Sequence, residues 1–307
     1  MSTNAPAIGA TPPPIAPAAL HRQFLDAFAQ VHQGHGSPDA QTPAPPGTPA
    51  LRIYDHLPST NEWLWHLDRT VGPLPDGTTA IALRQSAGRG QWGRQWQSPE
   101  GGLYLSWFVR PQTPADNAPQ LTLCAIWGIA AALRDRGIPV WIKWPNDLLL
   151  GDRKLGGILT ETRLGRNGMV DRAVIGIGLN WQNPTPDTGI SLAQWFEDNG
   201  PIPNLDSLAA IAAIVWHGLW RGYQTWEQQG IGGFLADYLE LLAHRGRPVT
   251  VGDRTGLVIG ITPQGELRVR FPDAPTADTP FPPGSLSLGY GRPPASHPET
   301  NPAAANP

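Results

Sequence analysis

Cysteine is nearly absent from the 307-residue sequence: Cys124 is the one example, and it lies within the apolar run Leu121–Leu133. One cysteine excludes an intramolecular disulfide framework and a zinc site built from several cysteines. Because a chain without disulfides suits a reducing compartment, we expect a cytoplasmic protein. The apolar surroundings of Cys124 favour a small buried side chain over a catalytic thiol.

The sequence also lacks long apolar runs and an excess of charge of either sign. No uninterrupted apolar segment reaches the ~18–20 residues that a membrane helix needs. The N-terminus has no basic region followed by an apolar one, as a signal peptide would have. Charged residues make up 15% of the chain and the net charge is -3, which gives no sign of a nucleic-acid surface. We therefore expect neither a membrane nor DNA as a partner.

Proline and glycine are abundant, at 35 residues each, and the prolines gather toward both ends of the chain. We interpret residues 1–50 as a Pro/Ala-rich leader with one short amphipathic helix at Ala18–His32 and a linker at Gly34–Ala50. Residues 51–243 are predicted to form the main domain, residues 244–290 a small β-domain, and residues 291–307 a disordered tail.

Strand and helix patterns are interleaved in the main domain, which predicts an α+β fold with a mixed sheet flanked by helices. The predicted helices are one capped by Ser59 or Thr60 and ending at Leu67, a buried one at Ala118–Arg136, and two more at Asp206–Gln228 and Phe234–Ala243. The predicted strands are Leu51–Tyr54, Thr79–Arg84, Leu103–Val109, Val140–Lys143, Leu148–Leu150, Lys154–Glu161 and Arg172–Gly178. Further short strands at Pro248–Val251, Gly256–Ile261, Leu267–Phe271 and Ser285–Leu288 predict a small SH3-like β-barrel.

A glycine-rich segment follows the second predicted strand. Gly88, Gly90 and Gly93 match the spacing G-x-G-x-x-G, but the helix that a dinucleotide-binding fold requires does not follow them. Glycines let backbone N–H groups approach a phosphate closely, and Arg89 and Arg94 can add charge-assisted hydrogen bonds. From these residues alone, a phosphate-binding loop and an ordinary surface loop remain equally open.

A second polar group comprises Lys143-Trp144-Pro145-Asn146-Asp147 and, soon after, Lys154. Lysines can neutralise phosphate or carboxylate charge. Asp147 can hold the Mg²⁺ that accompanies ATP, and the amide of Asn146 can face an adenine edge. Each residue alone could instead be solvated at a turn. Lys154, however, precedes the apolar run Leu155–Leu159 and needs a partner there.

Two further segments have both a structural and a functional interpretation. Ser59-Thr60-Asn61 stands at a predicted helix N-terminus, where the hydroxyls can cap the helix or meet a polar ligand. Gly176 and Gly178 alternate with apolar residues in a predicted strand, which indicates either a bulge or the close approach of a ligand.

Taken in order, these segments resemble the biotin–protein ligase family. The resemblance spans residues 51–180 and rests on Ser59-Thr60-Asn61, Gln85 with Gly88-Arg89-Gly90-x-x-Gly93-Arg94, Lys143-Trp144-Pro145-Asn146-Asp147, Lys154-x-x-Gly157-Ile158-Leu159, and Gly176-x-Gly178-x-Asn180. A small β-domain also stands where the family has one. The resemblance implies an enzyme that forms biotinyl-AMP from biotin and ATP with Mg²⁺. It would then biotinylate a lysine of the biotin carboxyl carrier protein of acetyl-CoA carboxylase, with a homodimer as one assembly.

The resemblance also implies a role for individual residues. Biotin is expected to contact Ser59, Thr60, Asn61, Gln85, Arg89, Gly90, Gln91, Lys154, Gly157, Gly176 and Gly178. ATP or its AMP part is expected to contact Gly88, Arg89, Gly90, Gln91, Gly93, Arg94, Lys143, Asn146 and Asn180. The expected catalytic residues are Lys154, Arg94 and Asp147, and Asp147 is the expected Mg²⁺ ligand.

Other functions remain as alternatives at the level of sequence. A lipoate ligase or octanoyltransferase would share the fold and the acyl chemistry. A non-enzymatic adaptor would retain the fold with a degenerate site, and an oxidoreductase is disfavoured by the missing helix after Gly93. Some members of the resembled family are also repressors with an N-terminal winged helix-turn-helix. Residues 1–50 offer one helix, too little for such a DNA reader, so no repressor function is expected.

The chain departs from the family pattern at two places. Many members carry arginine where this chain has Gln91, so the loop expected to cover biotinyl-AMP has one positive charge fewer. The loop Pro184–Ser191 has no aromatic residue that could cover adenine.

We predict that Gln91→Arg slows the release of biotinyl-AMP from the protein, because the added guanidinium attracts the adenylate phosphate. Stopped-flow measurement of adenylate release from the two proteins checks this. Equal release rates would contradict it.

Overall fold

The computed structural model describes residues 16–33 and 50–290. A mixed eight-stranded sheet lies at the centre of the main domain, in the order β1-β2-β3-β8-β7-β6-β5, with β4 beside β8. β1 and β2 run parallel, and the other neighbouring strands run antiparallel. The strands are β1 (Leu51–Leu57), β2 (Thr79–Gln85), β3 (Leu103–Val109), β4 (Thr113–Pro114), β5 (Val140–Lys143), β6 (Asp147–Leu150), β7 (Arg153–Leu164) and β8 (Met169–Leu179). The predicted mixed sheet is confirmed, and β7 and β8 extend beyond their predicted ends.

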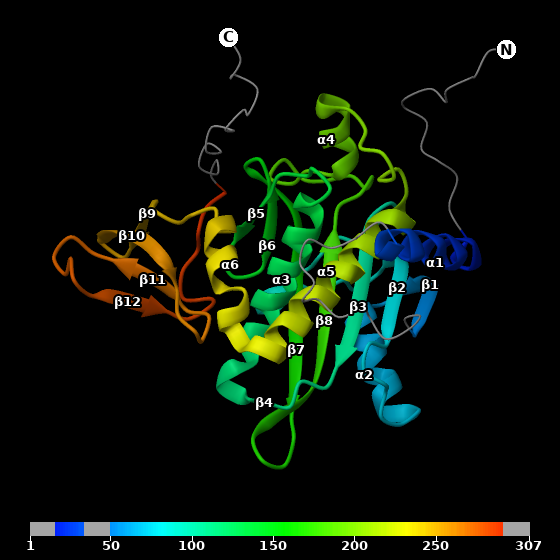
Figure 1. Ribbon diagram of the computed structural model, residues 1–307, viewed down its shortest axis with the longest axis horizontal. Coiled ribbons are helices and arrows are strands. Elements are labelled where there is room, and N and C mark those ends of the chain that lie inside the picture. The colour runs from blue at the N-terminus through cyan, green and yellow to red at the C-terminus, as the bar shows by residue number, and fades with distance from the viewer. Residues whose placement is uncertain (1–15, 34–49, 291–307) are drawn as a thin grey trace, which may run out of the picture.

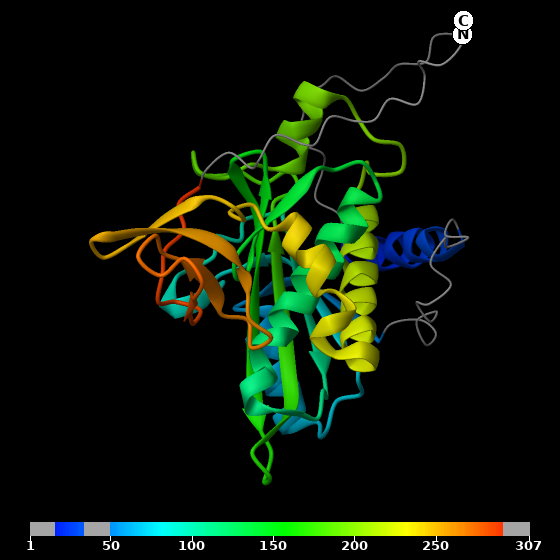
Figure 2. The same ribbon diagram turned by 60° about the vertical axis from the view of Figure 1, so that its left-hand side comes forward.

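Helices cover both faces of this sheet because successive residues of a strand point to opposite sides. In β3, Phe108 packs with Leu64 of α2 on one face, whereas Trp107 packs against Tyr223 of α5 on the other. Figures 1 and 2 show α2 on one side of the sheet, with α3 and α5 side by side on the other. The helices named so far are α2 (Thr60–Thr70), α3 (Ala118–Arg134) and α5 (Leu208–Gln229).

Glycines bring α3 and α5 into backbone contact. A Cβ on Gly128 of α3 would overlap the carbonyl oxygen of Gly218, and a Cβ on Gly222 would overlap the carbonyl oxygen of Cys124. Such close approach is available only to residues without a side chain. Cys124 is fully buried at this crossing, which confirms the prediction of a small buried side chain.

The predicted helix of the leader is part of the core. α1 (Pro17–Gln33) buries Leu20 and Phe24 completely, and the ring of Phe28 meets Trp216 of α5 edge-on with 5.0 Å between centroids. Its amphipathic pattern therefore reflects packing against α5 rather than an isolated helix in a flexible segment. The rest of the predicted leader, most of the linker and the predicted tail lie outside the described residues.

The C-terminal domain is compatible with the predicted small SH3-like β-domain, although its sheet is not closed. Its four strands form an open antiparallel sheet in the order β12-β11-β10-β9, not a closed barrel. Its last strand is Asp278–Phe281, where Asp278 pairs with Arg268 and Arg270 of β11, so the prediction of a strand at Ser285–Leu288 is wrong. The strands are β9 (Pro248–Val251), β10 (Arg254–Ile261), β11 (Leu267–Arg270) and β12 (Asp278–Phe281).

Several short helices complete the fold. α4 (Leu192–Asn199) was not predicted, although Ser191 and Gln194 form a reciprocal capping box at its start. α6 (Leu235–Leu241) confirms the predicted helix that precedes the small domain, and single turns of 3-10 helix occur at η1 (Gln91–Gly93), η2 (Ala115–Asn117) and η3 (Gly230–Gly233). Within residues 16–33 and 50–290, no helix has the length and apolar character needed to cross a membrane.

Phe24→Ala is expected to lower the free energy of unfolding by about 3–5 kcal/mol, because it leaves a cavity between α1 and α5. Urea denaturation followed by circular dichroism measures the loss. Gln23→Ala on the exposed side of the same helix is the matched control. A Phe24→Ala protein as stable as the control would show that α1 does not contribute to the core.

Candidate active site

A cavity of about 550 Å³ lies between the main sheet and the C-terminal segment. Its walls come from the N-terminus of α2, the glycine-rich loop after β2, the β5–β6 turn, the glycine-bearing parts of β7 and β8, and residues 284–288. The predicted residues that line it are Ser59, Thr60, Asn61, Gln85, Arg89, Gly90, Gln91, Arg94, Lys143, Asn146, Asp147, Lys154, Gly157, Gly176 and Gly178. Segments far apart in the sequence thus meet in one cavity, as predicted.

Three predicted residues have structural positions outside this lining. A Cβ on Gly88 would overlap the carbonyl oxygen of Trp96 within the loop, and Gly93 ends the η1 turn with φ +72°. Asn180 is buried, and its amide donates to the carbonyl oxygen of Ile190 at 3.2 Å. Asn180 therefore holds the loop after β8, and Gly88 and Gly93 shape the glycine-rich loop.

One end of the cavity is polar but uncharged. The hydroxyl oxygen of Ser106 lies 2.7 Å from Thr60 Oγ1 and 2.6 Å from Asn61 Oδ1. Gln85 Oε1 accepts a hydrogen bond from the backbone N–H of Thr60 at 2.8 Å. Ser59 is the N-cap of α2 but its hydroxyl makes no capping bond, so of the two interpretations of this segment capping by Ser59 is not realised. This end presents hydroxyls, amides and a helix N-terminus to a neutral polar group.

The floor of the cavity is bare backbone. Gly157 and Gly178 are paired opposite each other in the β7–β8 ladder. A Cβ on Gly178 would come within 2.5 Å of the indole ring of Trp96, and a Cβ on Gly176 would overlap Asn61 Oδ1. The β7–β8 register runs through Gly176 and Gly178 without a shift, so neither marks a bulge, and the space left by their missing side chains is taken by Asn61 and Trp96.

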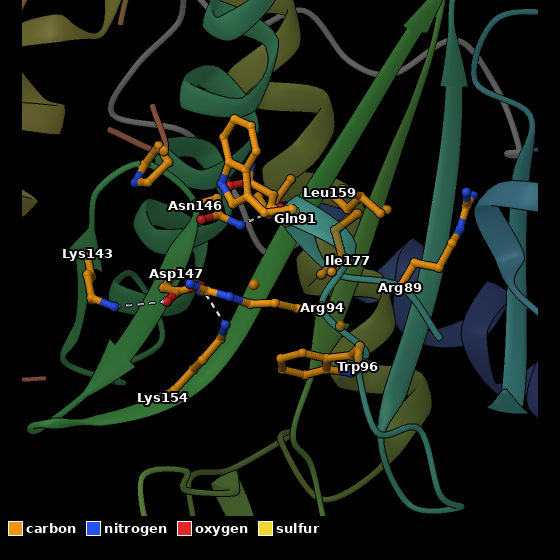
Figure 3. Close-up of a pocket in the computed structure, with 18 of the residues that line it drawn as sticks. Arg89, Gln91, Arg94, Trp96, Lys143, Asn146, Asp147, Lys154, Leu159 and Ile177 are labelled. Carbon is orange, nitrogen blue, oxygen red and sulfur yellow. Dashed lines mark hydrogen bonds and ion pairs between the residues drawn. The ribbon is translucent and has the colours of Figure 1, made fainter. Parts of the chain in front are cut away.

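The other end of the cavity is cationic. Lys154 Nζ lies 2.6 Å from Asp147 Oδ1, and Lys143 Nζ lies 3.4 Å from Asp147 Oδ2. The side chain of Arg94 extends toward the same group, as Figure 3 shows. Burial lowers the pKa of Lys143, an effect that Asp147 partly offsets and Lys154 and Arg94 reinforce. Among the described lining residues, Asp147 is the one carboxylate, and it lies among the three cationic side chains of this end, Lys143, Lys154 and Arg94, so this end attracts anions.

Hairpins and a loop hold the two lysines in place. Lys143 and Asp147 are paired across the β5–β6 turn, and Asp147 is paired with Gly157 of β7. The backbone of Lys154 donates to Thr188 at 2.8 Å and accepts from Ile190 at 3.0 Å. Lys143 and Lys154 are also the only lysines in the sequence, which otherwise uses arginine for permanent positive charge. At both positions the positive charge is therefore a compact ammonium group, whereas arginine would place a larger, planar guanidinium there.

The surroundings of Asp147 do not fit its predicted role as a Mg²⁺ ligand. Both oxygens of Asp147 face ammonium groups, and Mg²⁺ prefers a cage of several oxygens. The part of the chain described by the structure contains no group of three or more His, Cys, Asp or Glu residues that could hold a metal. Asp147 acts here as the counter-ion of two lysines.

Comparisons with known proteins agree with this geometry. The Biotin/lipoate A/B protein ligase family matches residues 54–180. The bifunctional ligase/repressor BirA of Escherichia coli is 38% identical over 224 residues, which cover 71% of this chain and 68% of that protein. This chain belongs to the biotin–protein ligases of that family. A biotin–[acetyl-CoA-carboxylase] ligase of Paracoccus denitrificans is 39% identical over 119 residues, covering 38% of this chain and 49% of that protein.

A solved structure extends the likeness of this biotin–protein ligase to its fold. The biotin protein ligase of Aquifex aeolicus, in a complex with biotin and ATP, superposes with a TM-score of 0.64 at 25% identity. The superposition covers 78% of this chain and 99% of that one.

Several residues of the ligase site were missed at the level of sequence. Trp96 walls the cavity, with Lys154 Nζ 5.2 Å from the centre of its ring. Trp96 comes directly after Arg94 and Gln95 of the glycine-rich segment, and this position could have identified it as a cavity residue. Ser106 and Glu161 support Thr60, Asn61 and Arg89 from β3 and β7, the strands on either side of β8. No local pattern identifies such supporting residues, because they depend on which strands become neighbours.

The C-terminal segment adds a further wall to the ligase site. Trp92, at a left-handed φ of +58°, lies so close to Gly284 that a Cβ there would overlap its ring. Tyr290 donates a hydrogen bond to Asp147 Oδ2 at 3.3 Å, and its ring centre lies 3.9 Å from Lys143 Nζ. Burial, together with Asp147, raises the pKa of Tyr290 to about 12, so the phenol stays a donor. The segment predicted as a strand of the small domain therefore completes the cavity instead.

Asp147→Asn is expected to lower the free energy of unfolding by about 2–3 kcal/mol. It leaves two neighbouring ammonium groups without their counter-ion, and the loss falls below that of a fully buried pair because both lysines keep some solvent contact. Chemical denaturation at neutral pH measures the loss. Asp273→Asn, which removes an exposed partner of Arg254, is the control and should cost under about 1 kcal/mol. Equal losses would contradict the counter-ion role of Asp147.

Proposed function

We propose that this chain activates biotin with ATP to form biotinyl-AMP and then transfers the biotinyl group to a lysine of a carrier protein. The observation that carries the proposal is the two-ended cavity: a neutral hydrogen-bonding end, an apolar and glycine-lined middle, and a cationic end. Biotin has the matching order of a neutral ureido ring, an aliphatic chain and a carboxylate. A nucleotide phosphate would then meet that carboxylate beside Lys154.

In the first step, a carboxylate oxygen of biotin attacks the α-phosphorus of ATP and pyrophosphate leaves. Both reactants are anions, so catalysis depends on neutralising their repulsion and holding them in line. Lys154, Arg94 and Lys143 supply the positive charge at the cationic end. Magnesium would enter as part of the ATP substrate, since the residues that the structure describes offer it no built site.

In the second step, the neutral amine of the acceptor lysine attacks the biotinyl carbonyl carbon. The bond from that carbon to the AMP oxygen breaks, and AMP leaves with its phosphate charge. Asp147 can take the proton that the amine loses, because it is the one carboxylate among the described lining residues. The glycine-rich loop and Trp92 shield the mixed anhydride from water.

The known relatives support both the ligands and the acceptor. The Aquifex aeolicus ligase, solved with biotin and ATP, covers 78% of this chain. The Paracoccus denitrificans relative is named for acetyl-CoA carboxylase, and we infer that the carrier domain of such a carboxylase is the acceptor here. The family description also includes lipoate ligases, so lipoate is the competing substrate to test.

Transfer of labelled biotin to a biotin carboxyl carrier domain, with ATP and Mg²⁺, tests the proposal. We expect biotin to be attached in an ATP-dependent reaction and lipoate to be refused. Transfer of lipoate in preference to biotin would assign the chain to the other branch of the family. Absence of any biotin-dependent exchange between ATP and pyrophosphate would contradict ligase activity.

Lys154→Ala is expected to slow biotinyl-AMP formation by about 100-fold or more, because it removes a donor that faces the developing negative charge. Biotin should still bind, since its ureido ring is held at the opposite end of the cavity. Pyrophosphate exchange measures the first effect and calorimetry the second. Lys154→Arg, which keeps the charge but changes its shape, should recover part of the rate. Near-normal exchange in Lys154→Ala would remove Lys154 from this role.

A further inference from the structure

Glu161 of β7 supports two residues of the cavity from behind. Its Oε2 accepts a hydrogen bond from Asn61 Nδ2 at 2.8 Å and another from Arg89 Nη2, also at 2.8 Å. Asn61 and Arg89 line the cavity, whereas Glu161 lies behind that lining. One carboxylate oxygen therefore joins the neutral end of the cavity to the glycine-rich loop, and the reaction steps above do not use it.

The contact with Glu161 fixes the direction of the Asn61 amide. Both hydrogens of Asn61 Nδ2 are used, one by Glu161 and one by the carbonyl oxygen of Leu159 at 3.2 Å. Asn61 Oδ1 accepts from Ser106 and lies over Gly176, where no Cβ crowds it. The amide thus turns its oxygen toward Ser106 and Gly176, and Gly176 is itself part of the cavity lining. That oxygen suits a ligand with an N–H donor, such as a cyclic urea.

The contact with Arg89 ties the glycine-rich loop to the sheet. Backbone bonds within the loop, from Gly90 N to Arg94 O at 2.6 Å and from Trp96 N to Gly88 O at 3.0 Å, make it a unit. Arg89 extends away from the cluster of Lys143, Asp147 and Lys154, as Figure 3 shows. Its ion pair with Glu161 is a side-chain tether between this unit and β7.

We propose that Glu161 is a positioning residue that couples recognition of the ureido ring to closure of the glycine-rich loop. The proposal deepens the proposed function and rests on it. A ureido N–H bound to Asn61 Oδ1 polarises the amide and strengthens its bond to Glu161. The carboxylate, held in one orientation, then holds Arg89 and with it the loop. Because coupling between sites is reciprocal, a closed loop also favours the ligand.

A purely structural role for Glu161 makes a different prediction. The side chains of Arg89 and Glu161 are 41% and 28% exposed, and ion pairs with that much solvent contact add little to stability. The thermal midpoint of Glu161→Gln should therefore stay close to that of the wild type. Its ligand affinity and its loop should change, which a structural role would not produce at unchanged stability.

The test measures two properties of wild type, Glu161→Gln and the control Glu197→Gln, which removes the same charge from an exposed position on α4. The first property is the Kd for biotin by calorimetry. The second is the rate of trypsin cleavage after Arg94, identified by mass spectrometry, with and without biotin. We expect Glu161→Gln to raise the Kd by about tenfold, which corresponds to about 1.4 kcal/mol. We also expect faster cleavage after Arg94 and a weaker protection by biotin.

Other results would overturn either the proposed function or the coupling by Glu161. A wild-type protein that does not bind biotin overturns the proposed function itself. A wild type that binds biotin, together with a Glu161→Gln protein that differs from it in only one property or in neither, overturns the coupling alone. If Glu161→Gln does not fold, Arg89→Gln cuts the same tether from the loop side and should weaken the protection at Arg94. In the double variant the two effects should not add, because both remove one interaction.

Discussion

One carboxylate between two ammonium groups is the constraint on which the rest of the site depends. Without Asp147, Lys143 and Lys154 would repel each other, and neither would keep a fixed place beside the glycine floor. With it, the group has a net positive charge and a fixed geometry before any ligand arrives. A preorganised positive charge costs no reorganisation when two anionic substrates are brought together. The presence of the chain's only lysines at this point agrees with that demand.

Two features of the fold shape the rest of the site: side chains that are missing at glycines, and polar groups that α2 and β3 provide. Glycines in β7 and β8 leave room on the sheet surface, so Trp96 and Asn61 can lie against it. The N-terminus of α2 and the strand residue Ser106 give the opposite end its neutral hydrogen-bonding groups. The small C-terminal domain contributes through the segment after its last strand, whose Tyr290 reaches Asp147.

Local patterns were sufficient to predict most helices and strands and most of the polar cavity residues, because strand alternation, glycine spacing and clustered polar groups can be recognised in short stretches of sequence. They were insufficient where the outcome depends on long-range partners. Whether α1 packs on α5, whether Ser285–Leu288 pairs as a strand, and which residue stands behind Asn61 are all decided by neighbours far away in the chain. The expected role of Asp147 toward magnesium depends on long-range partners in the same way, since only the folded chain shows how closely both lysines approach it.

The central claim is that the cationic end of this cavity receives a nucleotide phosphate joined to the ligand whose ring lies at the neutral end. Calorimetry with a hydrolysis-resistant analogue of biotinyl-AMP, compared with biotin and AMP separately, tests it most directly. The joined analogue should bind at least about 100-fold more tightly than biotin, because both ends of the cavity are then filled at once. An analogue that binds no better than biotin alone would contradict the account.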